Sequence, residues 1–291
     1  MRSILLRLIV CVFLLTGCGG RANGQSSSTG VKTIENIGSD TIVNLALAWA
    51  EAYQKLHPNL RISVTGGGSG TGIAALVNGT ADIANASRAM TDGEKQQAIK
   101  NNIQPFEIEI ARDAIAVVVY PGNPVNELTI QQISDIYTGK ITNWKEVGGE
   151  DRPIVLLSRE SNSGTHVYFL EQVIRLGQSA NTDLFSPDTL LLPSSEGIMA
   201  EVRQNPNAIG YDGLGYVTPD VKTIAIAAKA GGTYVLPSVE SVNAATYAIA
   251  RPLFMYTNGQ PTGSIKDYID WIRGPDGQTI VAQLGFVPLK K

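Results

Sequence analysis

Three segments of the sequence place small hydroxyl residues and glycines where an apolar, strand-like run gives way to a helical pattern. At such a point the first N–H groups of the helix have no partner within the helix, and the helix dipole favours an anion. Glycine lets the backbone approach a ligand closely, and hydroxyl groups add donors. Because ligands of open α/β sheets lie beyond the carboxyl ends of the strands, the three segments could converge on one small oxyanion. They are residues 38–41 (GSDT), 66–72 (GGGSGTG) and 158–165 (SRESNSGT).

The three segments differ in how strongly each one indicates a ligand. Segment 38–41 alone is typical of an ordinary capped helix start. Loop 66–72 has more glycines than a cap needs, but it is not a nucleotide P-loop, because Ile73 stands where that motif requires Lys. A dinucleotide fingerprint over 70–75 is weak, since Arg88 rather than an acidic residue lies near the position expected to hold the ribose. Segment 158–165 is the most informative, because Arg159 adds a cation that can bind an oxyanion with two donors.

Ser163 and His166 allow a second interpretation, a secreted serine hydrolase. A nucleophilic serine needs a base that is oriented by an acid, and the G-x-S-x-G motif is absent here. The other histidine, His57, precedes a helix-stopping proline, so we expect both histidines to pack or to face solvent. No cluster of His, Asp and Glu has the spacing of a metal site. We therefore expect no catalytic residue, metal or cofactor, and we keep the hydrolase as a remote alternative.

The elements that must position these segments follow from hydrophobic periodicity. Apolar runs of strand length alternate with helical patterns from about residue 33 to the end, which predicts α/β layers with mostly parallel strands. Two of these runs, 106–110 and 114–120, are split by the charged stretch 111–113, which suits a crossover between two lobes. Further strands are expected at 33–37, 60–65, 82–87, 154–157 and 245–250, with strand or turn at 208–217, and helices at 41–56, 91–101, 164–176 and 264–273, among others.

The N-terminus has the pattern of an export signal. Arg2 and Arg7 precede a short apolar run that ends in small residues, and this run is too short to be a permanent membrane span. Residues 15–18 (LTGC) resemble the bacterial lipobox, in which the cysteine is lipidated after cleavage; a plain signal with a chance cysteine is the alternative. We expect a signal peptide over 1–17, a lipidated Cys18 with a Gly/Ser-rich tether over 18–32, and an extracytoplasmic protein anchored to a membrane through that lipid.

Composition narrows the class of protein. The chain has 291 residues with 23 Lys+Arg against 26 Asp+Glu, so no strongly basic surface points to nucleic acid. Apolar residues make up 43% and charged residues 17%, as in ordinary globular proteins, and the length favours two compact units. Two cysteines cannot build a disulfide framework. We expect a monomeric body without internal repeats.

The three segments, in this order and with a lipobox, resemble the phosphate-binding protein of bacterial phosphate ABC transporters, the PstS family. Stretches 81–88, 111–119 and 136–144 match as well, and the most specific motif is Arg-x-x-x-Ser-Gly-Thr at 159–165. The resemblance covers almost the whole chain after the signal. It implies an α/β, two-lobed periplasmic-binding-protein fold of the class II type, with crossovers between lobes that close on the anion. Lobe 1 would comprise 33–112 plus 246–291, and lobe 2 would comprise 113–245.

The resemblance also implies a function and a set of ligands. The protein would capture inorganic phosphate and deliver it to the membrane permease of a phosphate ABC transporter, without covalent chemistry. Phosphate would be bound by residues of the three segments: Ser39, Asp40, Thr41, Ser69, Arg159, Ser163, Gly164 and Thr165.

One departure from the family concerns selectivity. The strand that matches 82–88 ends in Asp in well-known members, where that carboxylate accepts the proton of hydrogen phosphate and excludes sulfate; here the residue is Arg88. We expect Arg88 to contact the anion and another carboxylate to accept the proton. Asp113 is the first candidate, Asp40 the second and Asp212 the third, although a salt bridge at the crossover would equally explain Asp113. A receptor for sulfate, molybdate or a phosphate ester is the nearer alternative function.

Overall fold

The computed structural model describes residues 31–290. The predicted signal peptide over 1–17 and the predicted lipidation at Cys18 lie outside the described residues.

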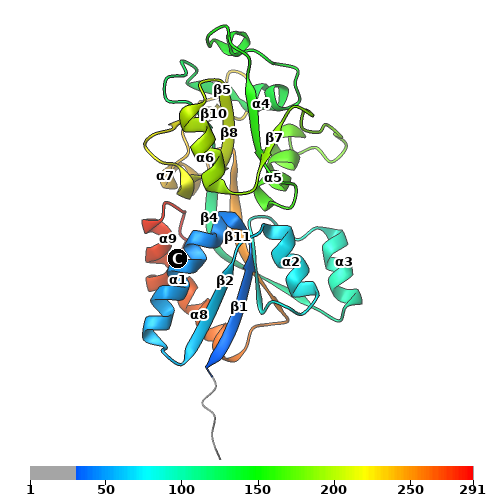
Figure 1. The fold of residues 1–291 in the computed structure, drawn as a ribbon, viewed down its shortest axis with the longest axis vertical. Coiled ribbons are helices and arrows are strands. Elements are labelled where there is room, and N and C mark those ends of the chain that lie inside the picture. Colours follow the sequence, from blue (N-terminus) through cyan, green and yellow to red (C-terminus); the bar gives the residue numbers. More distant parts are fainter. Residues whose placement is uncertain (1–30, 291) are drawn as a thin grey trace, which may run out of the picture. The chain divides into compact units, whose positions relative to one another are not determined.

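Figure 1 shows two groups of elements joined by two long strands. The helices are α1 (Asp40–Leu56), α2 (Ser69–Val77), α3 (Asp92–Lys100), α4 (Ile130–Tyr137), α5 (Gly164–Phe169), α6 (Ser195–Gln204), α7 (Val239–Asn243), α8 (Gly263–Arg273) and α9 (Pro275–Gln283). The strands are β1 (Lys32–Gly38), β2 (Leu60–Thr65), β3 (Ile83–Ala86), β4 (Pro105–Val119), β5 (Glu127–Thr129), β6 (Val155–Arg159), β7 (Leu190–Leu192), β8 (Ala208–Gly213), β9 (Lys222–Thr223), β10 (Ala225–Ala227) and β11 (Ala250–Asn258).

The strands follow one continuous path in the order β2-β1-β3-β11-β4-β8-β6-β7, with β9 beside β4 and a separate pair β10-β5. Strands at the two ends of the path are parallel: β1 with β2 and β3, and β6 with β7 and β8. The middle of the path is antiparallel, because β11 pairs with β3 and β4, and β4 pairs with β8. The predicted α/β class is confirmed, and the antiparallel strands are the crossovers between the two groups of elements.

Strand β4 differs from the prediction, since the two expected strands at 106–110 and 114–120 are one. The charged stretch between them stays in the ladder, where Asp113 lies opposite Arg251 of β11. Arg112 reaches Glu109 at 3.0 Å on the half-exposed side of the strand. The split was predicted from charge alone, but the charge of Asp113 is compensated across the strand pair and the backbone remains extended.

The last part of the chain also departs from expectation. Residues 245–249 form a turn, with Ala245 at φ 54°, and the late strand β11 begins at Ala250, where the predicted strand ended. The sequence interpretation missed α9, which starts with Pro275 at its first turn and directly follows α8. A proline with preset φ suits the first turn of a helix. The predicted helix over 164–176 is α5 followed by a wide helical turn at Leu170–Ile174.

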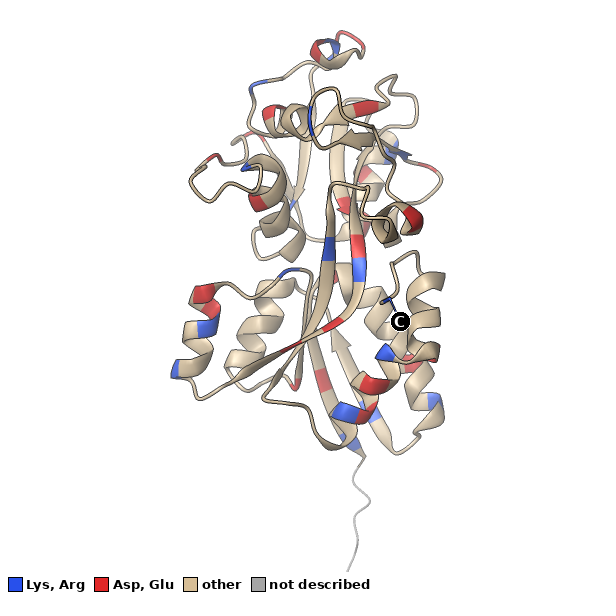
Figure 2. Cartoon of the chain, turned by 180° about the vertical axis from the view of Figure 1, so that it is seen from behind, with Lys and Arg blue, Asp and Glu red and all other residues tan. Residues whose placement is uncertain are grey.

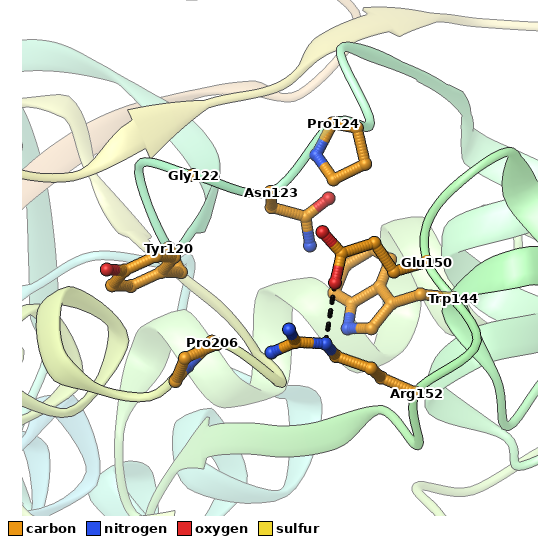
Figure 3. Close-up of a pocket in the computed structure, with 8 residues that line it drawn as sticks. All are labelled: Tyr120, Gly122, Asn123, Pro124, Trp144, Glu150, Arg152 and Pro206. Atoms are coloured by element: carbon orange, nitrogen blue, oxygen red, sulfur yellow. Dashed lines mark ion pairs between the residues drawn. The ribbon is translucent and has the colours of Figure 1, made fainter.

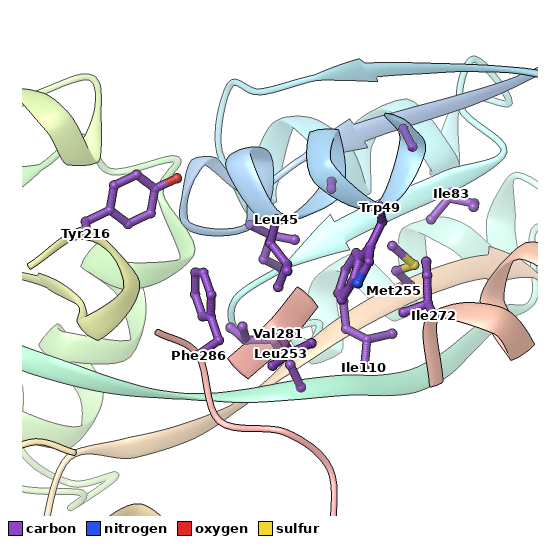
Figure 4. Close-up of a cluster of buried hydrophobic side chains, with 14 of the residues drawn as sticks. Leu45, Trp49, Ile83, Ile110, Tyr216, Leu253, Met255, Ile272, Val281 and Phe286 are labelled. Carbon is purple, nitrogen blue, oxygen red and sulfur yellow. The ribbon is translucent and has the colours of Figure 1, made fainter. Parts of the chain in front are cut away.

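A buried apolar cluster holds the N-terminal and C-terminal ends of the described chain together (Figure 4). Helix α1 buries Leu45 and Trp49 in this cluster. The Trp49 indole Nε1 donates to the carbonyl of Gly277 in α9 at 2.9 Å. Burial of a large aromatic side chain stabilises the fold by roughly 2–3 kcal/mol. This packing fixes the start of α1 relative to strand β11, which matters for the site below.

Candidate anion-binding site

The structure brings the starts of α1, α2 and α5 together. The hydroxyl oxygens of Thr41 in α1 and Thr165 in α5 lie 2.8 Å apart and share a hydrogen bond. The Gly70 N–H of α2 donates to the carbonyl of Asn162 at 3.0 Å, and the Asn162 amide donates to the Gly67 carbonyl at 2.9 Å. The three segments singled out from the sequence therefore do converge, with Ser39, Thr41, Ser69, Ser163 and Thr165 all buried.

Glycine is required at two positions of this convergence. Gly68, which precedes α2, has φ 94°, a conformation that side chains rarely adopt. Gly164 begins α5 so close to α2 that an added Cβ would lie within 2.5 Å of the Ser87 Oγ and closer still to the Ser69 Oγ. The Ser69 Oγ in turn accepts from the Ser87 N–H at 3.0 Å. The close approach of three backbone segments explains why small residues dominate them.

Arg159, at the end of β6, is held in a fixed orientation by four acceptors. Its Nη2 donates to the Asp40 carboxylate and to the Pro193 carbonyl, both at 2.8 Å. Its Nη1 donates to the Ser195 hydroxyl at 2.7 Å and to the Asp212 carboxylate at 3.2 Å. The side chain is 1% exposed. These contacts place Arg159 among the residues of the predicted site and leave its guanidinium group with little freedom.

One donor of Arg159 is unused. The Nε of Arg159 is buried and has no hydrogen-bond partner. Leaving a buried donor unsatisfied costs about 1–3 kcal/mol, and more for a charged group. An oxyanion that accepts from Nε would remove this cost. The chemistry of the donor set therefore fits an anion: a preset cation, helix N-termini and buried hydroxyl groups.

Arg251 of β11 is the residue that the sequence interpretation missed. It is 2% exposed, and its Nη2 donates to the Asp113 carboxylate and to the Thr165 hydroxyl, both at 2.9 Å. Its Nη1 donates to the Ser87 carbonyl at 3.0 Å. The available signal was a single arginine within the otherwise apolar run of β11. Figure 2 shows that charged residues do lie on the long crossing strands.

Asp113 is fully buried opposite Arg251. One oxygen accepts from the Arg251 Nη2 and the other from the Leu214 N–H at 3.1 Å. Burial raises the pKa of Asp113 to about 6, and the neighbouring Arg251 opposes that rise. The crossover salt bridge considered for Asp113 exists, but its partner is Arg251 and not the adjacent Arg112.

The two other candidate carboxylates flank Arg159. Asp40 accepts from the Gly67 N–H at 2.8 Å as well as from Arg159, and its side chain is 18% exposed. Asp212 accepts from the Gly213 N–H at 2.7 Å and is fully buried. Among the described residues, the cluster therefore holds the carboxylates of Asp40, Asp113 and Asp212 and the guanidinium groups of Arg159 and Arg251.

Arg88 does not join this cluster, contrary to our expectation. Its guanidinium group forms two hydrogen bonds of 2.7 Å with Glu94, which is the acidic residue of the α3 capping box with Thr91. The Nη1 also donates to the Ala89 carbonyl at 2.9 Å. Glu94 binds Arg88 bidentately on the side of α3 and occupies both of its Nη groups, while the Arg88 Nε is buried without a partner, as the Arg159 Nε is. The second guanidinium group of this cluster is that of Arg251.

The geometry does not pair Ser163 with His166. The Ser163 Oγ accepts from the Thr165 N–H as a helix cap, at 3.2 Å. His166 Nδ1 lies 3.0 Å from the Ser158 Oγ, and its ring stacks on Phe185 with centroids 4.5 Å apart. Burial lowers the pKa of His166. These contacts are those of a packing histidine.

Outside this cluster, the described residues offer no second site of this kind. Within residues 31–290 no group of three His, Cys, Asp or Glu side chains is placed to hold a metal ion. None of the helices described there is both long and apolar enough to cross a membrane. A surface hollow near Trp144, with an ion pair of 2.6 Å between Glu150 and Arg152, contains none of the predicted site residues (Figure 3).

Known proteins resemble this chain over most of its length. A model described as a PBP superfamily domain matches residues 23–276. The phosphate-binding protein PstS of Pseudomonas aeruginosa is 33% identical, with 92% of this chain and 85% of that protein covered. PstS of Bacillus subtilis is 29% identical over 99% of this chain and 94% of its own length.

Solved structures show the same two-lobed fold. One is a phosphate ABC transporter substrate-binding protein from Clostridium perfringens with bound phosphate. It is 35% identical with a TM-score of 0.80, and the match covers 89% of this chain and 100% of that one. An ABC-type phosphate transport receptor from Vibrio cholerae is 31% identical with a TM-score of 0.70, and 88% of this chain covers all of it. This chain therefore belongs to the PstS family of phosphate-binding proteins within the PBP superfamily.

Proposed function

We propose that this protein is an extracytoplasmic receptor that binds inorganic phosphate between its two lobes and delivers it to the membrane permease of a phosphate ABC transporter. The observation that carries the proposal is the buried convergence of the starts of α1, α2 and α5, with Arg159 bound to Asp40 of α1 and its buried Nε without a partner. Relatives named phosphate-binding proteins support the choice of anion. The proposed ligands are Arg159 and the residues at the three helix starts: Ser39, Asp40, Thr41, Ser69, Ser163, Gly164 and Thr165.

The donors suffice for tight binding. A dissociation constant of one micromolar corresponds to about 8 kcal/mol. Hydrogen bonds to a charged group contribute roughly 1.5–3 kcal/mol each after desolvation is included. Arg159 and several N–H and hydroxyl groups at the helix starts can reach this total without any metal. The protein's net charge of −3 does not oppose binding, because oriented local dipoles act at short range in a site shielded from water.

Selectivity would come from the carboxylates of the cluster. Sulfate has no proton near neutral pH, whereas hydrogen phosphate can donate one to a carboxylate. A fully ionised anion would meet three buried or half-buried acids and leave an acceptor unpaired, which costs affinity. We retain Asp113 as the first candidate acceptor, because it is fully buried and its partner Arg251 also contacts Thr165. Asp40 and Asp212 follow.

The proposed lobes are residues 33–112 plus 246–291, and residues 113–245. Thr41 would then belong to the first lobe and Thr165 to the second, so their hydrogen bond of 2.8 Å would join the lobes across the site. An anion bound to both helix starts would favour the closed arrangement. The signal peptide over 1–17, the lipid at Cys18, the tether over 18–32 and the monomeric state remain predictions from the sequence.

Calorimetric titration of ligand-stripped residues 19–291 with phosphate and then with sulfate tests the proposal. We expect tight binding of phosphate and no heat from sulfate. The Asp113→Asn variant should bind sulfate measurably, because the amide can donate to an anion that carries no proton. Equal binding of both anions by the unmodified protein would contradict phosphate selectivity and favour a receptor for another tetrahedral oxyanion.

A further inference from the structure

Arg251 has contacts that a merely structural arginine would not need. It lies on crossing strand β11 opposite Asp113 of β4, and its Nη2 reaches the hydroxyl of Thr165 at 2.9 Å. The same Nη2 lies 3.5 Å from the Thr41 hydroxyl. Arg251 thus contacts the hydroxyl groups that start α1 and α5, although it belongs to neither helix.

The direction of the hydrogen bonds follows from the chemistry of the groups. A guanidinium group can only donate, whereas a threonine hydroxyl can donate or accept. Because Arg251 donates to the Thr165 oxygen, the hydrogen of that hydroxyl must point elsewhere, toward Thr41 or toward a ligand. The bond of 2.8 Å between Thr41 and Thr165 leaves either atom free to be the donor. Arg251 therefore favours the orientation in which the Thr165 hydroxyl donates its own hydrogen, either to Thr41 or to a ligand.

We propose that Arg251 is a positioning residue of the anion site: by donating to the Thr165 oxygen it orients the hydrogen-bonded pair of Thr41 and Thr165, so that the hydroxyl hydrogen not shared within the pair is available to the bound anion. This inference rests on the proposed function, since it concerns the same phosphate site. Arg251 acts through the two threonines, because each of its three guanidinium nitrogens already donates to a protein acceptor, namely Asp113, the Ser87 carbonyl or Thr165.

Asp113 and Tyr168 keep the guanidinium group in place. Asp113 is fully buried and accepts from both Nε and Nη2 of Arg251, at 3.3 and 2.9 Å. The ring of Tyr168 lies 5.7 Å from the guanidinium carbon, and the Tyr168 hydroxyl donates to the Ala250 carbonyl at 2.8 Å. Arginine is required here because a single ammonium group cannot reach Ser87, Asp113 and Thr165 in one plane.

A double-mutant cycle on phosphate affinity tests the inference. Arg251→Lys retains a cation beside Asp113, and Thr165→Val removes the hydroxyl while keeping the shape. We expect Arg251→Lys to raise the Kd for phosphate at least fivefold in the unmodified background and less than twofold in the Thr165→Val background. An effect of Arg251 that does not pass through Thr165 would give the same fold-change in both backgrounds, because effects without coupling add.

A matched control and a second readout complete the design. Arg112→Lys changes the neighbouring crossover arginine, which pairs with half-exposed Glu109, and should leave the Kd within twofold. The second readout is the pH dependence of phosphate affinity in Arg251→Met. Asp113 faces Arg251 and, at longer range, Asp212, so loss of the guanidinium group raises the pKa of Asp113 further. The pH-dependent step in affinity should then move to higher pH in Arg251→Met and stay in place in Arg112→Lys.

The outcomes separate the inference from the proposed function. If the unmodified protein fails to bind phosphate, both are overturned. If it binds phosphate but Arg251→Lys changes the Kd equally in both backgrounds, only the role of Arg251 is overturned. Melting temperatures in phosphate-free buffer identify any variant that fails to fold. Should Arg251→Met not fold, the cycle with Arg251→Lys decides alone.

Discussion

Replacement of Arg159 by alanine should weaken phosphate binding strongly. The substitution removes the Nε donor that has no protein partner, and a hydrogen bond to a charged group contributes roughly 1.5–3 kcal/mol. This range corresponds to a rise in Kd of about 10- to 150-fold. The substitution also leaves Asp40 and Asp212 without the guanidinium group that now binds them at 2.8 and 3.2 Å. Because these carboxylates would then repel the anion, we expect a value near the upper end of the range.

Arg88→Ala is the matched control for this experiment. Arg88 pairs with Glu94 outside the cluster, so its removal should change the Kd for phosphate by less than twofold. Calorimetric titration at one fixed salt concentration measures both variants, and melting curves without phosphate show that each is folded. A folded Arg159→Ala protein with a Kd within threefold of the unmodified value would refute the argument from geometry. An equal loss in Arg88→Ala would restore the expectation drawn from the sequence.

Three further predictions concern packing, pH and anchoring. Gly164→Ala forces a Cβ against the hydroxyls of Ser69 and Ser87. It should therefore lower the free energy of unfolding by about 1–3 kcal/mol and weaken phosphate binding. An unchanged free energy of unfolding in urea would contradict the close packing. Burial lowers the pKa of His166, so the unfolded state takes up more protons as pH falls below about 6.5 and stability is lost. The melting temperature should therefore fall more steeply from pH 7 to 5 in the unmodified protein than in His166→Gln, and parallel curves would count against this account. Cys18→Ser should block processing or release the protein from membranes on fractionation, whereas normal processing with retention would argue against the lipobox.

Periodicity and helix-start chemistry predicted the elements that form the site. The apolar face of α1, the glycine-rich start of α2 and the motif at 159–165 each follow from local residue types, and the structure places their helix starts together. These features can be predicted from the sequence because helix capping and the need for glycine depend on residues only a few positions apart.

The partners of two charged side chains were not predicted from the sequence. Asp113 and Arg251 are 138 positions apart, and only the antiparallel register of β4 and β11 makes them partners. The same register keeps β4 continuous through its charged stretch. Arg88 was expected at the anion because its strand ends there, but the nearby Glu94 of the α3 cap binds it first. In both cases the sequence predicted the strand, but it did not show which residue the charged side chain pairs with.

A crystal structure of residues 19–291 with phosphate tests the central claim most directly. The account predicts one anion within hydrogen-bond distance of the Arg159 Nε and of donors at the starts of α1, α2 and α5, with Thr41 and Thr165 both in contact. Phosphate bound outside this cluster, or an empty cluster at saturating phosphate, would contradict it.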